Sequence, residues 1–335
     1  MSYQRIVMTQ YGAPDVLTLI EEQSLPIPRP NEVRVQMIAT SACFTDTLIR
    51  RGRYFGVKEK LPFSPGYDLV GQIDTVGEAV TDLRVGQRIA ALTVTGAYAE
   101  YLCLPAEECV PVPDSLDPAE AVSMVLTYVT AYQMLNRLAK IERGQRILVH
   151  GASGAVGTAL LQLGRTLGLE MFGTVSAANA ETVRQLGAVP IDYRNDDFVA
   201  RIASLTPPGV NAVFDAIGGS NFARSYRCLQ RSGTLVAYGT YRSAIGEEKG
   251  GFSSYMSLML RNLLPDGKSA VIYNITGLKK QHPDWFRQDL SALFQLLKDG
   301  RIQPLIARRF KLAEAAEAHR LLEARGVAGK LVLLA

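Results

Sequence analysis

A glycine-rich loop at residues 151–157 constrains the fold of this chain more than any other feature. It reads Gly151-Ala-Ser-Gly-Ala-Val-Gly157, follows a short apolar run at residues 146–150, and opens a segment at 155–167 with apolar residues at helical spacing. A strand that turns through glycines into a helix presents free backbone N–H groups and the positive end of the helix dipole, which suits the phosphates of a dinucleotide. A glycine-rich turn without a ligand is the alternative, and the strand–turn–helix context favours the phosphate site.

Each glycine of the loop has its own expected role. Gly151 permits the tight turn, Gly154 lets a pyrophosphate approach bare backbone, and Gly157 lets the helix pack closely on its strand. The residues of this region that we expect to contact the cofactor are Gly151, Ser153, Gly154, Ala155, Val156 and Gly157, with Gly173 on the following strand.

The chain around this loop alternates between short apolar runs and helical patterns. Expected strands lie at 146–150, 170–175, 189–193, 211–217, 234–238 and 269–274, and helices at 155–167, 180–186 and 196–204 lie between them. This alternation predicts an α/β domain, a doubly wound parallel sheet of the Rossmann type, over residues 124–275.

The remainder of the chain has a different rhythm. Residues 32–38 alternate between apolar and polar with period two, and 70–76 and 88–92 behave similarly between turn glycines. These patterns predict an antiparallel, barrel-like β domain. The tail from Trp285 has two helical patterns and a strand at 330–334, which we expect to rejoin it. The second domain is therefore predicted at 1–123 with 276–335.

Composition excludes several classes of partner. The net charge of +4 comes without a Lys/Arg block, so neither nucleic acid nor an anionic membrane is expected. Glu120 interrupts the longest apolar stretch, and residues 1–12 do not have the pattern of a secretion signal. Four cysteines without paired spacing indicate no disulfide framework. We expect a cytoplasmic protein that acts on a small molecule.

The end of the second strand bears on the choice of cofactor. The segment Gly173-Thr-Val-Ser176-Ala-Ala has no acidic residue, whereas NAD-specific sites hold the ribose hydroxyls with a carboxylate there. A carboxylate at this position would repel the 2′-phosphate of NADPH. Because the segment has none, NADPH is the predicted cofactor. The segment also has no Lys or Arg that could bind the 2′-phosphate. Arg194 and Arg325 are the candidates for supplying the positive charge that this phosphate needs.

Further motifs occur in order along the whole chain. They are Leu61-Pro-Phe-Ser-Pro-Gly66-Tyr-Asp-Leu-Val-Gly71, Val76-Gly77, Val85-Gly86-Gln-Arg88, Gly96-Ala-Tyr-Ala-Glu-Tyr101, Thr130-Ala131-Tyr132, Phe214-Asp215-Ala-Ile-Gly218-Gly219 and Gly329-Lys-Leu-Val-Leu333. Together with the loop, this set resembles the zinc-free quinone oxidoreductase and ζ-crystallin branch of the medium-chain dehydrogenase/reductase superfamily.

The resemblance implies a GroES-like N-terminal domain completed by the C-terminal segment, with the active site in the cleft between the domains. It places Thr130 and Gly239 beside the nicotinamide, and Ser176, Tyr193 and Arg325 near the 2′-phosphate of NADPH. It also implies a homodimer in which the last strand of the sheet, at 269–274, pairs with its copy.

Related alcohol dehydrogenases carry a catalytic zinc, and this chain retains only part of that pattern. Cys43 matches the first ligand, but Tyr67 stands where the family has a His, and no third Cys follows. The four-cysteine lobe for structural zinc is also missing. Catalytic zinc needs three protein ligands, so no metal is predicted. The preferred interpretation of Cys43 is a small half-buried residue at the catalytic site, facing the cofactor.

Without a metal to polarise a carbonyl, hydride addition favours acceptors that are already electrophilic, such as quinones and α,β-unsaturated carbonyls. By resemblance, Tyr54 lines the substrate site and donates the proton; a tyrosine that merely packs is the alternative. Tyr67 is a second possible donor, and Asp46 is expected to orient its neighbours.

Two other functions stay open: a trans-2-enoyl-thioester reductase and a non-catalytic NADPH-binding protein. The apolar stretch at 250–260 is either a flap over a lipophilic substrate or part of the core, and a stripe of Met and Leu at helical spacing favours the core.

Overall fold

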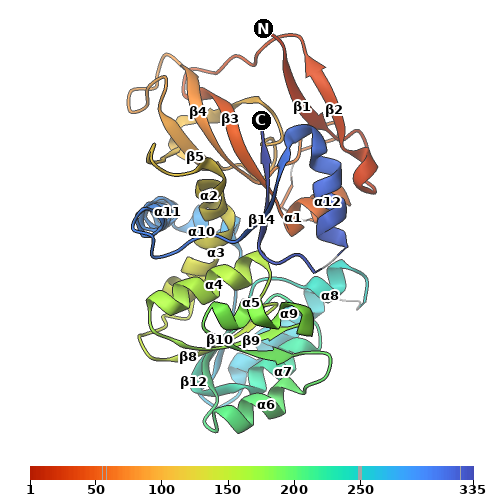
Figure 1. Cartoon of the computed structure of the whole chain (residues 1–335), viewed down its shortest axis with the longest axis vertical. Helices are drawn as coiled ribbons and strands as arrows, with labels where there is room; N and C mark the ends of the chain where they lie inside the picture. The colour runs from red at the N-terminus through yellow and green to blue at the C-terminus, as the bar shows by residue number, and fades with distance from the viewer. Residues whose placement is uncertain (55, 58, 248–250, 325) are drawn as a thin grey trace. The chain divides into compact units, whose positions relative to one another are not determined.

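The computed structural model describes residues 1–54, 56–57, 59–247, 251–324 and 326–335. The chain forms two compact units (Figure 1): unit 1 comprises Met1–Val129 and Asp284–Ala335, and unit 2 comprises Thr130–Pro283. The tail lies with the N-terminal part, because β15 (Lys330–Leu334) pairs antiparallel with β3 (Glu32–Ala42).

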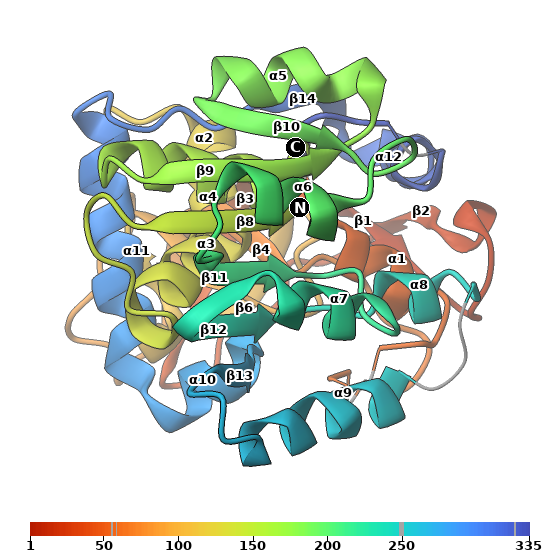
Figure 2. The same ribbon diagram turned by 90° about the horizontal axis from the view of Figure 1, so that it is seen from below.

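Unit 2 contains a six-stranded parallel sheet. Its strands are β8 (Arg146–His150), β9 (Glu170–Val175), β10 (Ala188–Asp192), β11 (Val210–Asp215), β12 (Leu229–Ala237) and β13 (Ser269–Ile272). They are arranged in the order β10-β9-β8-β11-β12-β13, which Figure 2 shows from its upper to its lower edge. The strand order reverses between β8 and β11, the place where doubly wound sheets bind ligands at the carboxyl ends of the strands. The predicted Rossmann-type sheet is confirmed.

Helices connect these strands. They are α4 (Ala155–Thr166), α5 (Ala180–Gln185), α6 (Phe198–Leu205), α7 (Asn221–Arg227), α8 (Tyr241–Ala244), α9 (Gly251–Leu260) and α10 (Ile275–Gln281). In α9, Leu258 is buried and Tyr255 and Met259 pack against the core of the sheet. Met256 and Leu260 are exposed. The core interpretation therefore holds for one side of this helix.

Unit 1 contains a seven-stranded sheet in the order β14-β15-β3-β4-β5-β7, with β6 paired to β3. Its other strands are β4 (Asp68–Val76), β5 (Arg88–Leu92), β6 (Tyr101–Pro105), β7 (Val110–Pro111) and β14 (Ile306–Lys311); β1 (Tyr3–Val7) and β2 (Thr18–Glu22) form a separate pair. The alternation seen in the sequence is borne out on β3, where Val33, Val35 and Met37 are buried. The pairing is antiparallel except between β14 and β15.

Helices accompany the sheet of unit 1. They are α1 (Phe44–Arg50), α2 (Pro118–Ser123), α11 (Pro283–Lys298) and α12 (Ala315–Glu323), and α2 continues through a π-helical turn, Met124–Tyr128, into α3 (Val129–Gln133). The side chain of Asp117 caps α2. Within the described ranges, no helix is both long and apolar enough to cross a bilayer.

Candidate functional site

The glycine loop of unit 2 leaves the start of α4 bare. Gly151 has a φ of +65°, and a Cβ built there would meet no atom within 4 Å. A Cβ on Gly154 would meet only the Gly151 carbonyl oxygen, at 3.3 Å. Gly154 is also the residue that precedes α4, so no side chain caps the helix. A twelve-residue helix that starts in open glycine backbone fits the phosphate groups of a dinucleotide.

Two other predicted glycines act through close packing. A Cβ on Gly157 would lie 2.3 Å from the Gly151 carbonyl oxygen, so only glycine lets α4 approach the loop this closely. A Cβ on Gly173 would lie 2.6 Å from the Cβ of Ala152. Gly173 is buried beneath the loop and holds β9 against it.

The other residues predicted to contact the cofactor in this part of unit 2 differ in exposure. Ser153, Ala155, Val156 and Ser176 are half-buried. The Asn179 amide lies 3.4 Å from Ser153 Oγ, a neighbour that sequence reasoning missed because it follows the second strand without a charge. Tyr193 is 54% exposed, with the Arg194 guanidinium 5.8 Å from its ring. Arg325 lies outside the described residues.

The two residues expected beside the nicotinamide both lie in unit 2. Thr130 is its first residue and is 6% exposed. Gly239 follows β12 and is half-buried, and a Cβ there would lie 3.1 Å from the Ala216 carbonyl oxygen. The chain after β12 therefore runs tightly along the chain after β11.

In unit 1 the structure brings the two predicted proton donors together. The hydroxyls of Tyr54 and Tyr67 are 2.7 Å apart, and their rings meet edge to face with centroids 5.9 Å apart. Tyr67 is buried and Tyr54 is half-buried. Sequence reasoning named both residues but could not show that they form a pair.

The two phenols differ in acidity. Burial raises the pKa of both hydroxyls above the usual value for tyrosine, so both are protonated at neutral pH. One hydrogen bond joins the two oxygens, and either hydroxyl can be its donor. When the Tyr67 O–H donates, the Tyr54 proton is free for another acceptor.

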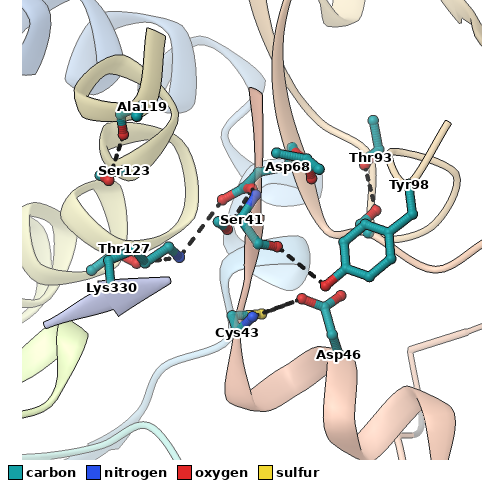
Figure 3. Close-up of polar contacts among 12 residues, drawn as sticks. Ser41, Cys43, Asp46, Asp68, Thr93, Tyr98, Ala119, Ser123, Thr127 and Lys330 are labelled. Atoms are coloured by element: carbon teal, nitrogen blue, oxygen red, sulfur yellow. Dashed lines mark hydrogen bonds and ion pairs between the residues drawn. The ribbon is translucent and has the colours of Figure 1, made fainter. Parts of the chain in front are cut away.

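Cys43 belongs to a buried polar cluster beside α1 (Figure 3). Its Sγ and its backbone N–H each lie 2.9 Å from Asp46 Oδ2. Burial, and then the Asp46 carboxylate, raise the pKa of the Cys43 thiol well above its usual value. Burial raises the pKa of Asp46 to about 7. Asp46 thus orients Cys43, as expected.

A second carboxylate of unit 1 joins the C-terminal strand to the sheet. Asp68 Oδ1 accepts hydrogen bonds from Ser41 N at 3.0 Å and Ser41 Oγ at 2.5 Å. Lys330 on β15 donates to Thr127 Oγ1 at 2.8 Å and lies 3.9 Å from Asp68 Oδ2 (Figure 3). The π-helical turn that contains Thr127 therefore contacts both β4 and β15 through one buried lysine.

Sequence reasoning assigned no chemistry to His319, which the structure places in this region. Its Nε2 lies 3.1 Å from the Tyr98 hydroxyl, and burial lowers its pKa to about 3. Arg50 is also buried and pairs with Glu323. These contacts join residues far apart in the sequence, and no local pattern could have revealed them.

The side chains near Cys43 bear on the question of a catalytic zinc. Zinc binds thiolate, imidazole and carboxylate groups, and a phenol, Tyr67, stands at the position where the zinc-dependent relatives have a His. Among the residues that the structure describes, no group of three His, Cys, Asp or Glu side chains is placed to hold a metal ion.

Known proteins resemble this chain over its whole length. Residues 29–114 match the alcohol dehydrogenase GroES-like domain, and residues 186–333 match the zinc-binding dehydrogenase family. A quinone oxidoreductase of Pseudomonas aeruginosa is 34% identical over 335 residues, covering 99% of both chains. A synaptic vesicle membrane protein VAT-1 homolog of Danio rerio is 30% identical, covering 99% of this chain and 70% of that protein.

A solved structure supports the same assignment. The quinone oxidoreductase of Escherichia coli, crystallised with NADPH, has a TM-score of 0.89 and 27% identity, covering 99% of this chain and 100% of that chain. The mixed fold with a parallel sheet and a GroES-like N-terminal part agrees with that structure. The chain therefore belongs to the quinone oxidoreductase branch of the medium-chain dehydrogenase/reductase superfamily, and it is an oxidoreductase.

Proposed function

We propose that this protein is a zinc-independent reductase that uses NADPH to reduce quinones and other activated alkenes, with Tyr54 as proton donor. The observation that carries the proposal is the hydrogen-bonded pair of Tyr54 and Tyr67, 2.7 Å apart, both protonated at neutral pH. The bare start of α4 supports the cofactor assignment.

In this proposal the cofactor is held by unit 2. The backbone N–H groups at the start of α4, from Ala155 and Val156, bind its phosphates together with Ser153 and the loop glycines. Thr130 and Gly239 border the nicotinamide. Ser176, Tyr193, Arg194 and Arg325 serve the 2′-phosphate, and Asn179 joins this group through its contact with Ser153.

Reduction of a quinone to a hydroquinone adds one hydride and one proton. The bound cofactor supplies the hydride. Tyr54 donates its phenolic proton to the oxygen on which negative charge develops. The Tyr67 hydroxyl, 2.7 Å from the Tyr54 oxygen, donates to the phenolate that remains and stabilises it until water returns a proton. An α,β-unsaturated carbonyl receives the hydride at its β-carbon, and the enolate oxygen is the proton acceptor.

Zinc independence rests on the donor set. Cys43 is held as a protonated thiol by Asp46, and Tyr67 is engaged with Tyr54. Electrophilic acceptors need no Lewis acid, which agrees with the class of substrate proposed. The cysteines at 43, 103, 109 and 228 form no disulfide in the described part of the chain, which fits a reducing compartment such as the cytoplasm.

We further propose a homodimer formed at the free edge of the unit 2 sheet. β13 is the last strand in the order, and exposed apolar side chains occur on it and on the neighbouring segments, namely Met256, Leu260, Leu263, Leu264 and Ile272. The side chain of Asn262 already binds the backbone N–H and C=O of Ala270, so strand pairing with a copy would start at Ile272. Light scattering should show a wild-type dimer and a monomeric Ile272→Lys variant; a wild-type monomer would contradict the proposal.

The central experiment measures binding and turnover separately. NADPH and NADH are titrated by fluorescence, and oxidation of the bound cofactor is then followed with 1,4-benzoquinone, an enone and a 2-enoyl thioester. We expect tighter binding of NADPH. We also expect Tyr54→Phe to lower kcat for the enone about a hundredfold, as for other general acids, with no change in the Kd of NADPH.

Tyr101→Phe is the matched control, since Tyr101 lies on β6 against Tyr3, 6.0 Å between ring centroids. Equal rates for Tyr54→Phe and Tyr101→Phe would remove Tyr54 from the mechanism. Binding without turnover of any acceptor would favour a non-catalytic NADPH-binding protein. Preferential turnover of the thioester would favour an enoyl-thioester reductase, and a preference for NADH would contradict the cofactor assignment.

A further inference from the structure

Four buried polar side chains lie together at the carboxyl ends of three strands of unit 2. His150 is the last residue of β8, Thr174 lies opposite it on β9, and Asp215 ends β11. Ser225, on α7, completes the group. All four side chains are at least 97% buried. They lie where the strand order reverses, yet the proposed reaction gives none of them a role.

Hydrogen bonds connect the four in a row. Ser225 Oγ lies 2.7 Å from Asp215 Oδ2 and 2.9 Å from His150 Nε2. His150 Nδ1 lies 2.9 Å from Thr174 Oγ1, and this oxygen accepts from the backbone N–H of Gly151 at 3.3 Å. The row therefore begins at a carboxylate and ends at the first amide of the phosphate loop.

The chemistry of the groups allows one direction for every proton in the row. Ser225 Oγ donates to Asp215 Oδ2. A hydroxyl has one proton, so Ser225 Oγ must accept from His150 Nε2–H. Burial lowers the pKa of His150, which leaves the ring neutral, so its Nδ1 has a lone pair that accepts the Thr174 proton. The Thr174 oxygen is then the acceptor for Gly151 N–H. No alternative arrangement satisfies all of these atoms.

We propose that His150 is a positioning residue for the cofactor, because its neutral Nε2–H ring joins the Asp215 carboxylate to the Gly151 amide and holds the phosphate loop in its binding geometry. This inference rests on the proposed function, since it concerns binding of the same dinucleotide. None of the four side chains needs to touch the cofactor for the effect.

Asp215 organises a second segment at the same time. Its Oδ1 accepts from the backbone N–H groups of Ile217 at 2.7 Å and Gly218 at 3.2 Å. A Cβ on Gly218 would lie 2.8 Å from Thr240 Cα, so this turn packs directly against the segment that contains Gly239. One carboxylate thus fixes the chain after β11 directly and the loop after β8 through His150. Such preorganisation lowers the entropic cost of binding.

The first test removes or retains the Thr174 hydroxyl. Thr174→Val keeps the shape but leaves the Gly151 amide without its acceptor, and we expect the Kd of NADPH to rise about three- to tenfold. Thr174→Ser retains the hydroxyl and should restore binding. Thr206→Val is the matched control: its buried hydroxyl donates to the Gly209 carbonyl at 2.9 Å, before the start of β11, and we expect no change in Kd.

The second test separates the two sides of the imidazole. In His150→Asn the side-chain amide should reach Thr174 but not Ser225. In His150→Gln it should reach Ser225 but not Thr174. Both variants should weaken NADPH binding. Hydrogen exchange of the 151–157 amides in the cofactor-free protein should rise more in His150→Gln, which releases Thr174, than in His150→Asn.

The outcomes distinguish this inference from the proposed function. If the wild-type protein binds no NADPH, the proposed function fails and the inference fails with it. If the wild-type protein binds NADPH but Thr174→Val binds as tightly as Thr206→Val, the inference alone is wrong. Faster loop exchange in Thr174→Val, reversed in Thr174→Ser together with the recovery of Kd, would support it, because a general loss of stability would not recover with one hydroxyl.

Discussion

The two units differ in how completely their buried polar groups are hydrogen-bonded. In the row from Asp215 to Gly151 of unit 2, each donor meets an acceptor. Five buried side-chain atoms in the described part of the chain have no hydrogen-bond partner, and all five belong to unit 1. They are Asp46 Oδ1, Arg50 Nε and Nη1, Asp68 Oδ2 and His319 Nδ1.

This difference separates a rigid region from one whose titratable groups have shifted pKa values. A satisfied buried network fixes its members, whereas an unsatisfied polar group bears the full cost of leaving water. In unit 1 that cost appears as displaced pKa values, about 7 for Asp46 and about 3 for His319, and burial is the largest cause of both. The phosphate loop is thus built on the satisfied network, and the proposed proton donor lies in the unit with the unsatisfied groups.

The largest effect is expected when the satisfied network is broken at Asp215. Its carboxylate accepts hydrogen bonds from Ile217 N, Gly218 N, Asn221 Nδ2 and Ser225 Oγ. Asp215→Asn turns one accepting oxygen into a donating amide that faces other donors. We expect the free energy of unfolding to fall by about 3–5 kcal/mol, since charge-assisted hydrogen bonds are lost.

Urea unfolding followed by hydrogen exchange of unit 2 peptides measures this loss. Asp266→Asn is the control: this carboxylate of unit 2 accepts from Lys268 N and from the Tyr226 hydroxyl near the surface, and a much smaller loss is expected. Equal losses in the two variants would mean that the Asp215 network contributes no special stability.

In unit 1, replacing an Asp with Asn should raise the free energy of unfolding instead of lowering it. The folded protein holds a proton on Asp46 up to a pKa of about 7, whereas an unfolded Asp releases it near pH 4, so stability falls as pH rises between these values. Asp46→Asn removes this cost. Its upper limit is about 4 kcal/mol, and we expect a gain of about 2 kcal/mol at pH 8, because the hydrogen bonds from Cys43 weaken when their acceptor is neutral.

Trp285, the chain's one tryptophan, lies in unit 1, so its fluorescence follows urea unfolding of that unit. The gain from Asp46→Asn should largely disappear at pH 4, where the wild-type carboxyl is protonated in the folded state and about half protonated in the unfolded state. Destabilisation at pH 8 would show that Asp46 is needed as an ionised partner of Cys43.

Local sequence patterns predicted most of the fold but only part of the candidate site. β5, β8, β9 and β15 begin and end where the apolar runs predict, because their periodicity is set by neighbouring residues. The pairing of Tyr54 with Tyr67 depends on the fold of unit 1, and the role of His150 depends on α7. An apolar strand that ends in His gives no signal of its own, since the same residue in many cores is only packed.

The contacts of His319 illustrate the limit of sequence reasoning. Its helix, α12, agrees with the helical patterns of the tail, yet its partner Tyr98 lies more than two hundred positions earlier. The contact exists because β15 pairs with β3 and brings the tail back to the start of the chain. Such a pairing is a property of the whole unit 1 sheet, and no window of sequence contains it.

The smallest expected effect concerns the pH dependence of the stability of unit 1. It tests whether the shifted pKa values of Asp46 and His319 change this stability in opposite directions. His319 takes up a proton near pH 6.5 when unfolded but only near pH 3 when folded, so it makes stability fall as pH decreases below about 6.5. Asp46 acts in the opposite direction over nearly the same range, so the wild-type protein should show little net slope. His319→Gln retains a partner for Tyr98 without titrating, and Trp285 fluorescence should then show stability rising by about 1 kcal/mol from pH 6 to pH 5. A flat profile in this variant would mean that the pKa of Asp46 is not raised as described, and a profile equal to that of the wild-type protein would mean that the pKa of His319 is not lowered.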